Sequence, residues 1–181
     1  MQKVKTSIIV FILTVLFIRF ANGQGKYIPC NLTKEESKYI FTTVNSDAFF
    51  KGGTRGWVNY SDKNFDFNPV IKALPDSVNE FRDSILVKFI VTKAGKICEI
   101  CFIGGNELLY APVFTLLEKS PDWIPGITSA GNYVHSYHLL RLRVYVNKNE
   151  KIYTIQRLGA LTTYKQYVSI VRLVFLSPLL L

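Results

Sequence analysis

The sequence predicts an α+β fold, with a small antiparallel sheet of three to four strands packed with two short helices. From Ser84 to Val91, apolar and polar residues alternate, as is typical of a strand with one buried face. A turn signal at 92–96 leads into a second β-rich stretch, and a third follows at 133–146, after a segment with helical spacing. With 181 residues, 49% apolar and 14% aromatic, the chain can bury a core, which excludes disorder over its whole length.

Residues 1–23 have the layout of a secretory signal peptide. Lys3 and Lys5 precede an apolar run over 7–18, and small residues then favour cleavage after Gly23. An uncleaved membrane anchor is the alternative, but the apolar run forms only about 18 Å of helix against a hydrocarbon core of about 30 Å. We therefore expect an exported protein with a cleaved leader.

The stretch 24–38 is predicted to be coil with a short helical turn near its end. Thr33 and Glu36 have the spacing of a capping box, which places a helix start at this point. The β-rich stretch 39–44 fits a strand as well as the continuation of a helix, and the sequence leaves both open.

A short amphipathic helix is predicted over 54–65, after the turn signal Gly52-Gly53. Its aromatic residues Trp57 and Tyr60 lie about one helical turn apart and therefore share a face. The prolines and polar residues of 69–75 predict a connecting loop before the sheet.

The best-defined strands are predicted at 84–91 and 97–103. Gly95 supplies the positive φ that the tight connection between them needs. The buried face of the first strand is expected to carry Ile85, Val87, Phe89 and Val91.

A second helix is predicted from Pro112, which suits a first helical turn, to about Lys119. A third strand follows within 133–146, and polar residues at 147–150 turn the chain into a fourth strand at 151–156.

The formal charge of +9 does not predict a nucleic-acid-binding protein. The segments 1–23 and 151–181 carry seven bases and no acid, whereas 24–150 is close to neutral. A near-neutral domain lacks the positive electrostatic potential needed to bind along a phosphate backbone, so we expect no nucleic-acid partner.

Three cysteines leave at least one thiol unpaired within the chain. Cys98 and Cys101 have the spacing of a redox or zinc pair, and His135 and His138 have a spacing that suggests metal ligands. Both pairs fall in predicted strands, where residues three apart point to opposite faces about 10 Å apart. We therefore expect no metal, no cofactor and no redox centre.

Short motifs recur along the chain, and we expect their residues to be structural: Phe50, Gly52, Gly53, Gly95, Pro121, Trp123, Pro125 and Gly126. Together they resemble the C-terminal domain of TonB energy transducers of the type common in Bacteroidetes. The resemblance covers about 39–147, with Lys51 where the family has proline and Asp83 where it has glycine.

The resemblance implies a binding domain without a catalytic centre. Members of this family bind a short extended segment of outer-membrane receptors by adding it to a sheet edge as a strand. We expect the last long strand to be that edge, with Arg141 and Arg143 either pairing with acidic peptide residues or simply solvated. Trp123 is expected in the core, with a groove lining as the alternative. The predicted binding residues are Tyr137, Leu139, Arg141, Arg143 and Tyr145.

Two features depart from a complete transducer of this family. The leader is predicted to be cleaved, and the seven prolines are scattered and form no spacer. We therefore expect a periplasmic domain, 39–157, that binds a TonB-dependent receptor or another envelope protein. The alternatives are a short transducer anchored in the inner membrane and an envelope interaction module that no longer binds receptors. The apolar tail 158–181 is expected to pack on the sheet, with contact to a membrane and an origin in a shifted reading frame as the alternatives.

Overall fold

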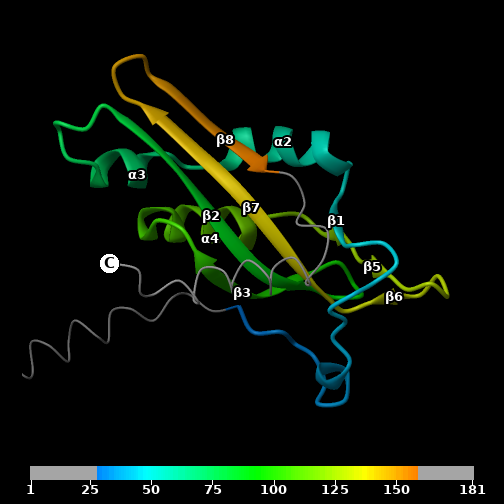
Figure 1. Cartoon of the computed structure of the whole chain (residues 1–181). Helices are drawn as coiled ribbons and strands as arrows, with labels where there is room; N and C mark the ends of the chain where they lie inside the picture. Colours follow the sequence, from blue (N-terminus) through cyan, green and yellow to red (C-terminus); the bar gives the residue numbers. More distant parts are fainter. Residues whose placement is uncertain (1–27, 159–181) are drawn as a thin grey trace, which may run out of the picture.

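The computed structural model of the chain describes residues 28–158 (Figure 1). The predicted signal peptide and the apolar tail from residue 159 onward lie outside the described residues. The described part is mixed α and β with antiparallel strand pairing, so the predicted α+β class is confirmed, with three α-helices where two were predicted. Its main sheet has four strands in the order β3-β2-β7-β8.

The predicted hairpin is confirmed as β2 (Glu80–Val91) and β3 (Ile97–Gly104). Strand β2 begins earlier than predicted because it pairs with β7 (Ser136–Asn147) along its whole length. Gly95 in the turn has a φ of +82°, and a Cβ there would collide with the carbonyl oxygen of Trp123. Glycine is therefore required at this turn for two separate reasons.

The predicted third and fourth strands are also present, but the third is split into two strands. The predicted stretch 133–146 contains a short strand, β6 (Tyr133–Val134), and then β7, separated by His135. Strand β8 (Ile152–Leu158) pairs antiparallel with the second half of β7.

Three α-helices pack on one face of this sheet. The predicted first helix is α2 (Gly53–Asn64), and the predicted second is α4 (Tyr110–Glu118). Between them lies α3 (Asn68–Ala73), where the sequence predicted a loop. Pro69 occupies the first turn of α3, a position at which proline leaves no helical hydrogen bond unmade. Two short 3₁₀ helices complete the helical content of the described residues, η1 (Glu36–Lys38) and η2 (Glu107–Leu109).

Short strands tie the loops to the core. Strand β1 (Phe49–Phe50) pairs with β4 (Trp123–Ile124), and β5 (Gly126–Ile127) pairs with β6. Gly126 lies so close to β7 that a Cβ would stand 2.6 Å from the Ser136 hydroxyl oxygen. The glycine lets the loop containing β5 approach the sheet.

The core lies between the helices and one face of the sheet. Trp123 is 2% exposed, which confirms the predicted core position, and its indole N–H donates to the Ser120 hydroxyl at 3.2 Å. Aromatic rings surround it edge-on or tilted, an arrangement that contributes beyond the buried area. They belong to Phe50, Trp57, Phe89 and His138.

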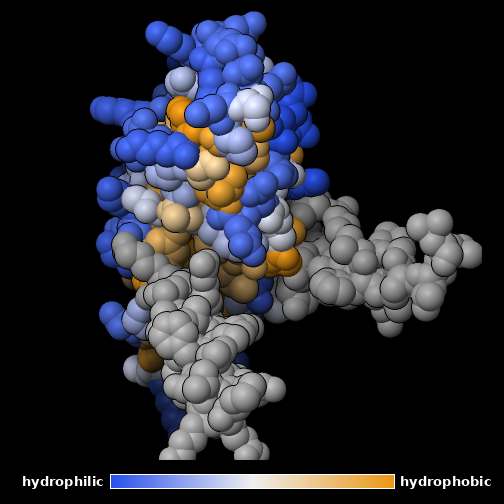
Figure 2. Space-filling view, turned by 90° about the vertical axis from the view of Figure 1, so that its left-hand side faces the viewer, coloured by the Kyte–Doolittle hydropathy of each residue, from blue (hydrophilic) through white to orange (hydrophobic). Residues whose placement is uncertain are grey.

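The surface seen in Figure 2 carries hydrophobic residues in a broken band along its middle, flanked by hydrophilic ones. Within residues 28–158, no helix combines the length and the apolar character needed to cross a bilayer.

Candidate functional site

The five residues predicted to form a peptide-binding edge lie on β7, and their side chains share the sheet face opposite the helices. Strand β7 is an interior strand, so the prediction that its whole length forms an edge is wrong. The turn after Asn147 brings β8 back along β7, and the predicted fourth strand thus occupies the edge. Arg141, Arg143 and Tyr145 are paired with Leu158, Gln156 and Thr154.

The first half of β7 is different, because β8 does not extend beside it. Within the described residues, its outer side is bridged by Phe41, which lies parallel to Ser136. The N–H of Phe41 donates to the His135 carbonyl at 2.8 Å, and the N–H of Tyr137 donates to the Phe41 carbonyl at 3.0 Å. Two backbone hydrogen bonds therefore hold one extended residue on this part of the edge.

The pairing also fixes which backbone groups face outward on β7. Because His135 and Tyr137 bond to Phe41, alternation along the strand directs the N–H and C=O of Leu139 to the same side. Leu139 lies between the Phe41 bridge and the pair formed by Arg141 and Leu158. The structure thus brings Tyr137 and Leu139 to an edge position, unlike the other three predicted residues.

The outer edge of β8 is partly covered. Helix α2 lies alongside β8 in Figure 1 and contacts it. The ring of Tyr153 near the start of β8 lies 5.7 Å from that of Phe67, beyond the end of α2. An incoming strand therefore meets less obstruction at the first half of β7 than along β8.

The opposite edge of the sheet is held by the N-terminal segment. Cys30 forms a disulfide with Cys98 of β3, and the N–H of Glu99 donates to the Ile28 carbonyl at 2.8 Å. Cys101 is the free, exposed cysteine among the described residues. The odd number of cysteines was evident beforehand, but nothing in the sequence selected Cys30 as the partner of Cys98.

The prediction that Cys98 and Cys101 point to opposite faces is wrong. Cys98 lies opposite Ile90 and Cys101 opposite Lys88, two residues of β2 that share a face. A β-bulge accommodates the extra residue of β3, and Glu99 adopts a positive φ of 50° within it. The bulge therefore places both cysteines on the face away from the helices.

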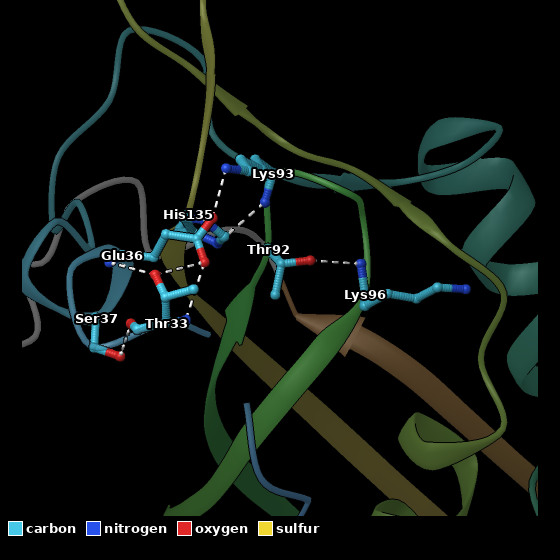
Figure 3. Close-up of polar contacts among 7 residues, drawn as sticks. All are labelled: Thr33, Glu36, Ser37, Thr92, Lys93, Lys96 and His135. Atoms are coloured by element: carbon cyan, nitrogen blue, oxygen red, sulfur yellow. Dashed lines mark hydrogen bonds and ion pairs between the residues drawn. The ribbon is translucent and has the colours of Figure 1, made fainter. Parts of the chain in front are cut away.

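A polar cluster anchors the segment that leads to Phe41 (Figure 3). Thr33 and Glu36 form the predicted capping box, with the Thr33 N–H donating to the carboxylate and the Glu36 N–H donating to the hydroxyl. The same carboxylate accepts from Lys93 Nζ at 2.6 Å. These bonds, that of Lys93 foremost, lower the pKa of Glu36 to about 2.

His135 completes this cluster as a neutral acceptor. It is 6% exposed, and burial lowers its pKa despite the nearby carboxylate of Glu36. Its Nδ1 accepts the backbone N–H of Lys93 at 3.3 Å. His138 lies elsewhere, between the rings of Phe89 and Trp123, where burial lowers its pKa to about 3. The two histidines therefore occupy separate environments.

The described residues hold no group of three or more His, Cys, Asp or Glu side chains arranged to bind a metal ion. An open cleft of about 270 Å³ lies beside the β2–β3 turn and is lined in part by Ile28, Ile97 and Leu117. At its rim, Lys96 and Asp122 form an ion pair of 2.5 Å, and the Ser120 hydroxyl accepts from Trp123. The polar groups named here are thus already partnered to one another.

No protein-family model matches the chain, and it has no significant match among curated proteins or among solved structures.

Proposed function

We propose that this chain is a periplasmic protein with a TonB C-terminal-like fold, which binds an extended segment of an outer-membrane receptor or another envelope protein. The segment adds as a strand to the outer side of the first half of β7, from Ser136 to Leu140. The role is binding, without catalysis. The partner class comes from the resemblance of the motifs around Phe50, Gly95 and Trp123 to the TonB family.

The observation that supports this site most strongly is the bridge made by Phe41. It shows an extended residue in parallel orientation on the backbone groups that a peptide would use. The neighbouring chain is only lightly packed, since Tyr39 is 67% exposed and Phe41 is 38% exposed. A peptide that displaces or extends this bridge gains main-chain hydrogen bonds, while alternate side chains supply selectivity.

Titration of the isotope-labelled full chain with synthetic ten-residue peptides tests this proposal. The peptides cover the periplasmic N-termini of the host's TonB-dependent receptors. We expect at least one to shift the backbone amide signals of Tyr137 and Leu139 more than those of β8. A peptide with a central proline is the matched control, because it lacks the N–H that a ladder needs. Absence of binding at millimolar peptide, or shifts confined to other elements, would overturn the proposal.

Variants at Phe41 test whether the peptide replaces the Phe41 bridge on β7 or binds without displacing it. Phe41→Pro removes the N–H that donates to His135, whereas Phe41→Ala keeps it. If the segment competes with the peptide, losing a hydrogen bond of about 0.5–1.5 kcal/mol raises affinity roughly 2–10-fold in the proline variant relative to the alanine variant. Equal affinities in two folded variants would show that the peptide does not replace the bridge.

A further inference from the structure

The sheet face opposite the helices carries a line of cations on two neighbouring strands. Arg141 and Arg143 are exposed on β7, and Arg82 and Lys88 lie on the same face of β2. On β2, β7 and β8, the positions that share this face include one carboxylate, Glu80, at the end of β2. On these three strands the face is therefore basic, although the body of the chain is close to neutral.

Two of these cations are held above aromatic rings. The guanidinium of Arg82 lies 5.2 Å from the ring centroid of Tyr145, and Lys88 Nζ lies 4.9 Å from that of Tyr137. Such contacts restrain a charged side chain against the sheet without neutralising it. The cations are thus partly ordered before any partner arrives.

The register gives the spacing of the line. Leu86 lies opposite Arg141, Ser84 opposite Arg143, and Lys88 opposite Leu139. The four cations therefore fall in four successive rows, each two residues from the next, or about 7 Å. An extended chain with an acidic residue at every second position repeats at the same distance.

Within residues 28–158, no carboxylate forms an ion pair with any of these four cations. All 13 acids of the sequence lie within 28–158, and residues 1–27 and 159–181 carry only bases. Glu35, Glu36 and Asp122 instead form ion pairs with Lys38, Lys93 and Lys96. The complement to the four cations is therefore to be sought in another molecule.

We propose that this face, defined by Arg82, Lys88, Arg141 and Arg143, binds an acidic extended segment of a partner protein. Apolar side chains between the cations, Leu86 and Leu139, add contact area for such a segment. A regular strand spacing favours a peptide over a membrane surface, which has no fixed spacing of charges. Residues 28–158 carry only a small net charge, which also disfavours a nucleic-acid partner. This site is on the face of the sheet and does not depend on strand addition at its edge.

The native thiol of Cys101 provides a reporter for this face. It is exposed and lies opposite Lys88, so a fluorophore attached there senses a ligand on the cation line. The probe is the heptapeptide Glu-Thr-Glu-Thr-Glu-Thr-Glu, and the control peptide has Gln in place of each Glu. We expect the labelled full chain to bind the first peptide at least fivefold more tightly than the second, and less tightly as salt is raised.

Charge reversal then locates the site. Arg141→Glu with Arg143→Glu should weaken binding of the acidic peptide about tenfold, since two exposed ion pairs are lost and repulsion replaces them. Lys63→Glu with Lys72→Glu makes the same change of charge at exposed positions of α2 and α3 and should leave the affinity within twofold. Arg141→Gln with Arg143→Gln, a milder change, should weaken binding about threefold if the reversed variant does not fold.

Three results would overturn the proposal. The first is equal loss in the face variant and the helix variant, which would indicate attraction by net charge alone. The second is no difference between the acidic peptide and its Gln control. The third is tight binding of phosphatidylglycerol vesicles or a 20-nucleotide single strand at this face without binding of the peptide. The edge proposal is unaffected by these outcomes, because strand addition is tested by the proline-interrupted control peptide and by the Phe41 variants, which leave the four cations unchanged.

Discussion

The Cys30–Cys98 disulfide is expected to contribute about 4 kcal/mol to the free energy of unfolding. The two residues are 68 positions apart. Closing a loop of that length removes about 15 cal/mol/K of entropy from the unfolded chain, or about 4 kcal/mol at 25 °C. The double variant Cys30→Ala, Cys98→Ala removes this constraint. It also frees Ile28, whose carbonyl accepts from Glu99 on β3.

Urea denaturation followed by tryptophan fluorescence measures this effect. With a denaturant slope of about 2 kcal/mol/M, the unfolding midpoint of the double variant should fall by roughly 2 M urea. Cys101→Ala is the matched control, because it removes an exposed thiol outside the disulfide and should shift the free energy by less than about 0.5 kcal/mol. A double variant within 1 kcal/mol of the parent would refute the reasoning. So would a digest of the oxidised chain in which Cys98 is joined to Cys101.

Two further predictions concern the turn and the buried histidine. Gly95→Ala should destabilise the fold by at least 2 kcal/mol more than Gly131→Ala in the same denaturation assay. Both glycines have a φ near +80°, but only at Gly95 would the new Cβ meet the carbonyl oxygen of Trp123. Equal losses of unfolding free energy in the two variants would show that the positive φ alone, and not the contact with Trp123, determines the destabilisation. His138 has a folded pKa of about 3, lowered by burial and then by the charge of Arg157, against about 6.5 when unfolded. Its contribution is therefore present above pH 6.5 and is lost as pH falls toward 3, with a slope of about 1 kcal/mol per pH unit. His138→Phe should flatten stability against pH in that window, and an unchanged slope would contradict the burial argument.

Local patterns were sufficient to predict most of the sheet. Alternation at Ile85, Val87 and Phe89 follows directly from one buried face, and the turn at Gly95 needs only the residues beside it. The same holds for α4 and for the capping box at Thr33, whose partners lie within a few residues. These features depend on short-range geometry, which a sequence records directly.

The order of strands could not be obtained in this way. Whether β7 is an edge depends on where β8 returns and on which segment Phe41 reaches, and both are long-range facts. The sequence predicted a fourth strand after the turn at 147–150, and that strand was itself the reason why Arg141 and Arg143 could not lie at the edge. Helix α3 was missed because Pro69 interrupts a helix interior but is favourable in a first turn.

The candidate site was predicted in part. Arg141 and Arg143 share an exposed face, as alternation indicates, but Arg82 and Lys88 join them only through the register of β2 against β7. Cys98 and Cys101 show the opposite case, in which a bulge at Glu99 shifts the alternation by one residue. No feature of the sequence alone marked that shift.

The covalent link at Cys98 also decides how tension would travel through the domain. A pull applied ahead of Ile28 would reach β3 through the disulfide, bypassing the chain from 31 to 48 and the Phe41 bridge. In the reduced chain, the same pull would pass along that segment and peel Phe41 from β7 one hydrogen bond at a time. In the oxidised protein, tension applied ahead of Ile28 would thus load β3 and would not load the hydrogen bonds between Phe41 and β7.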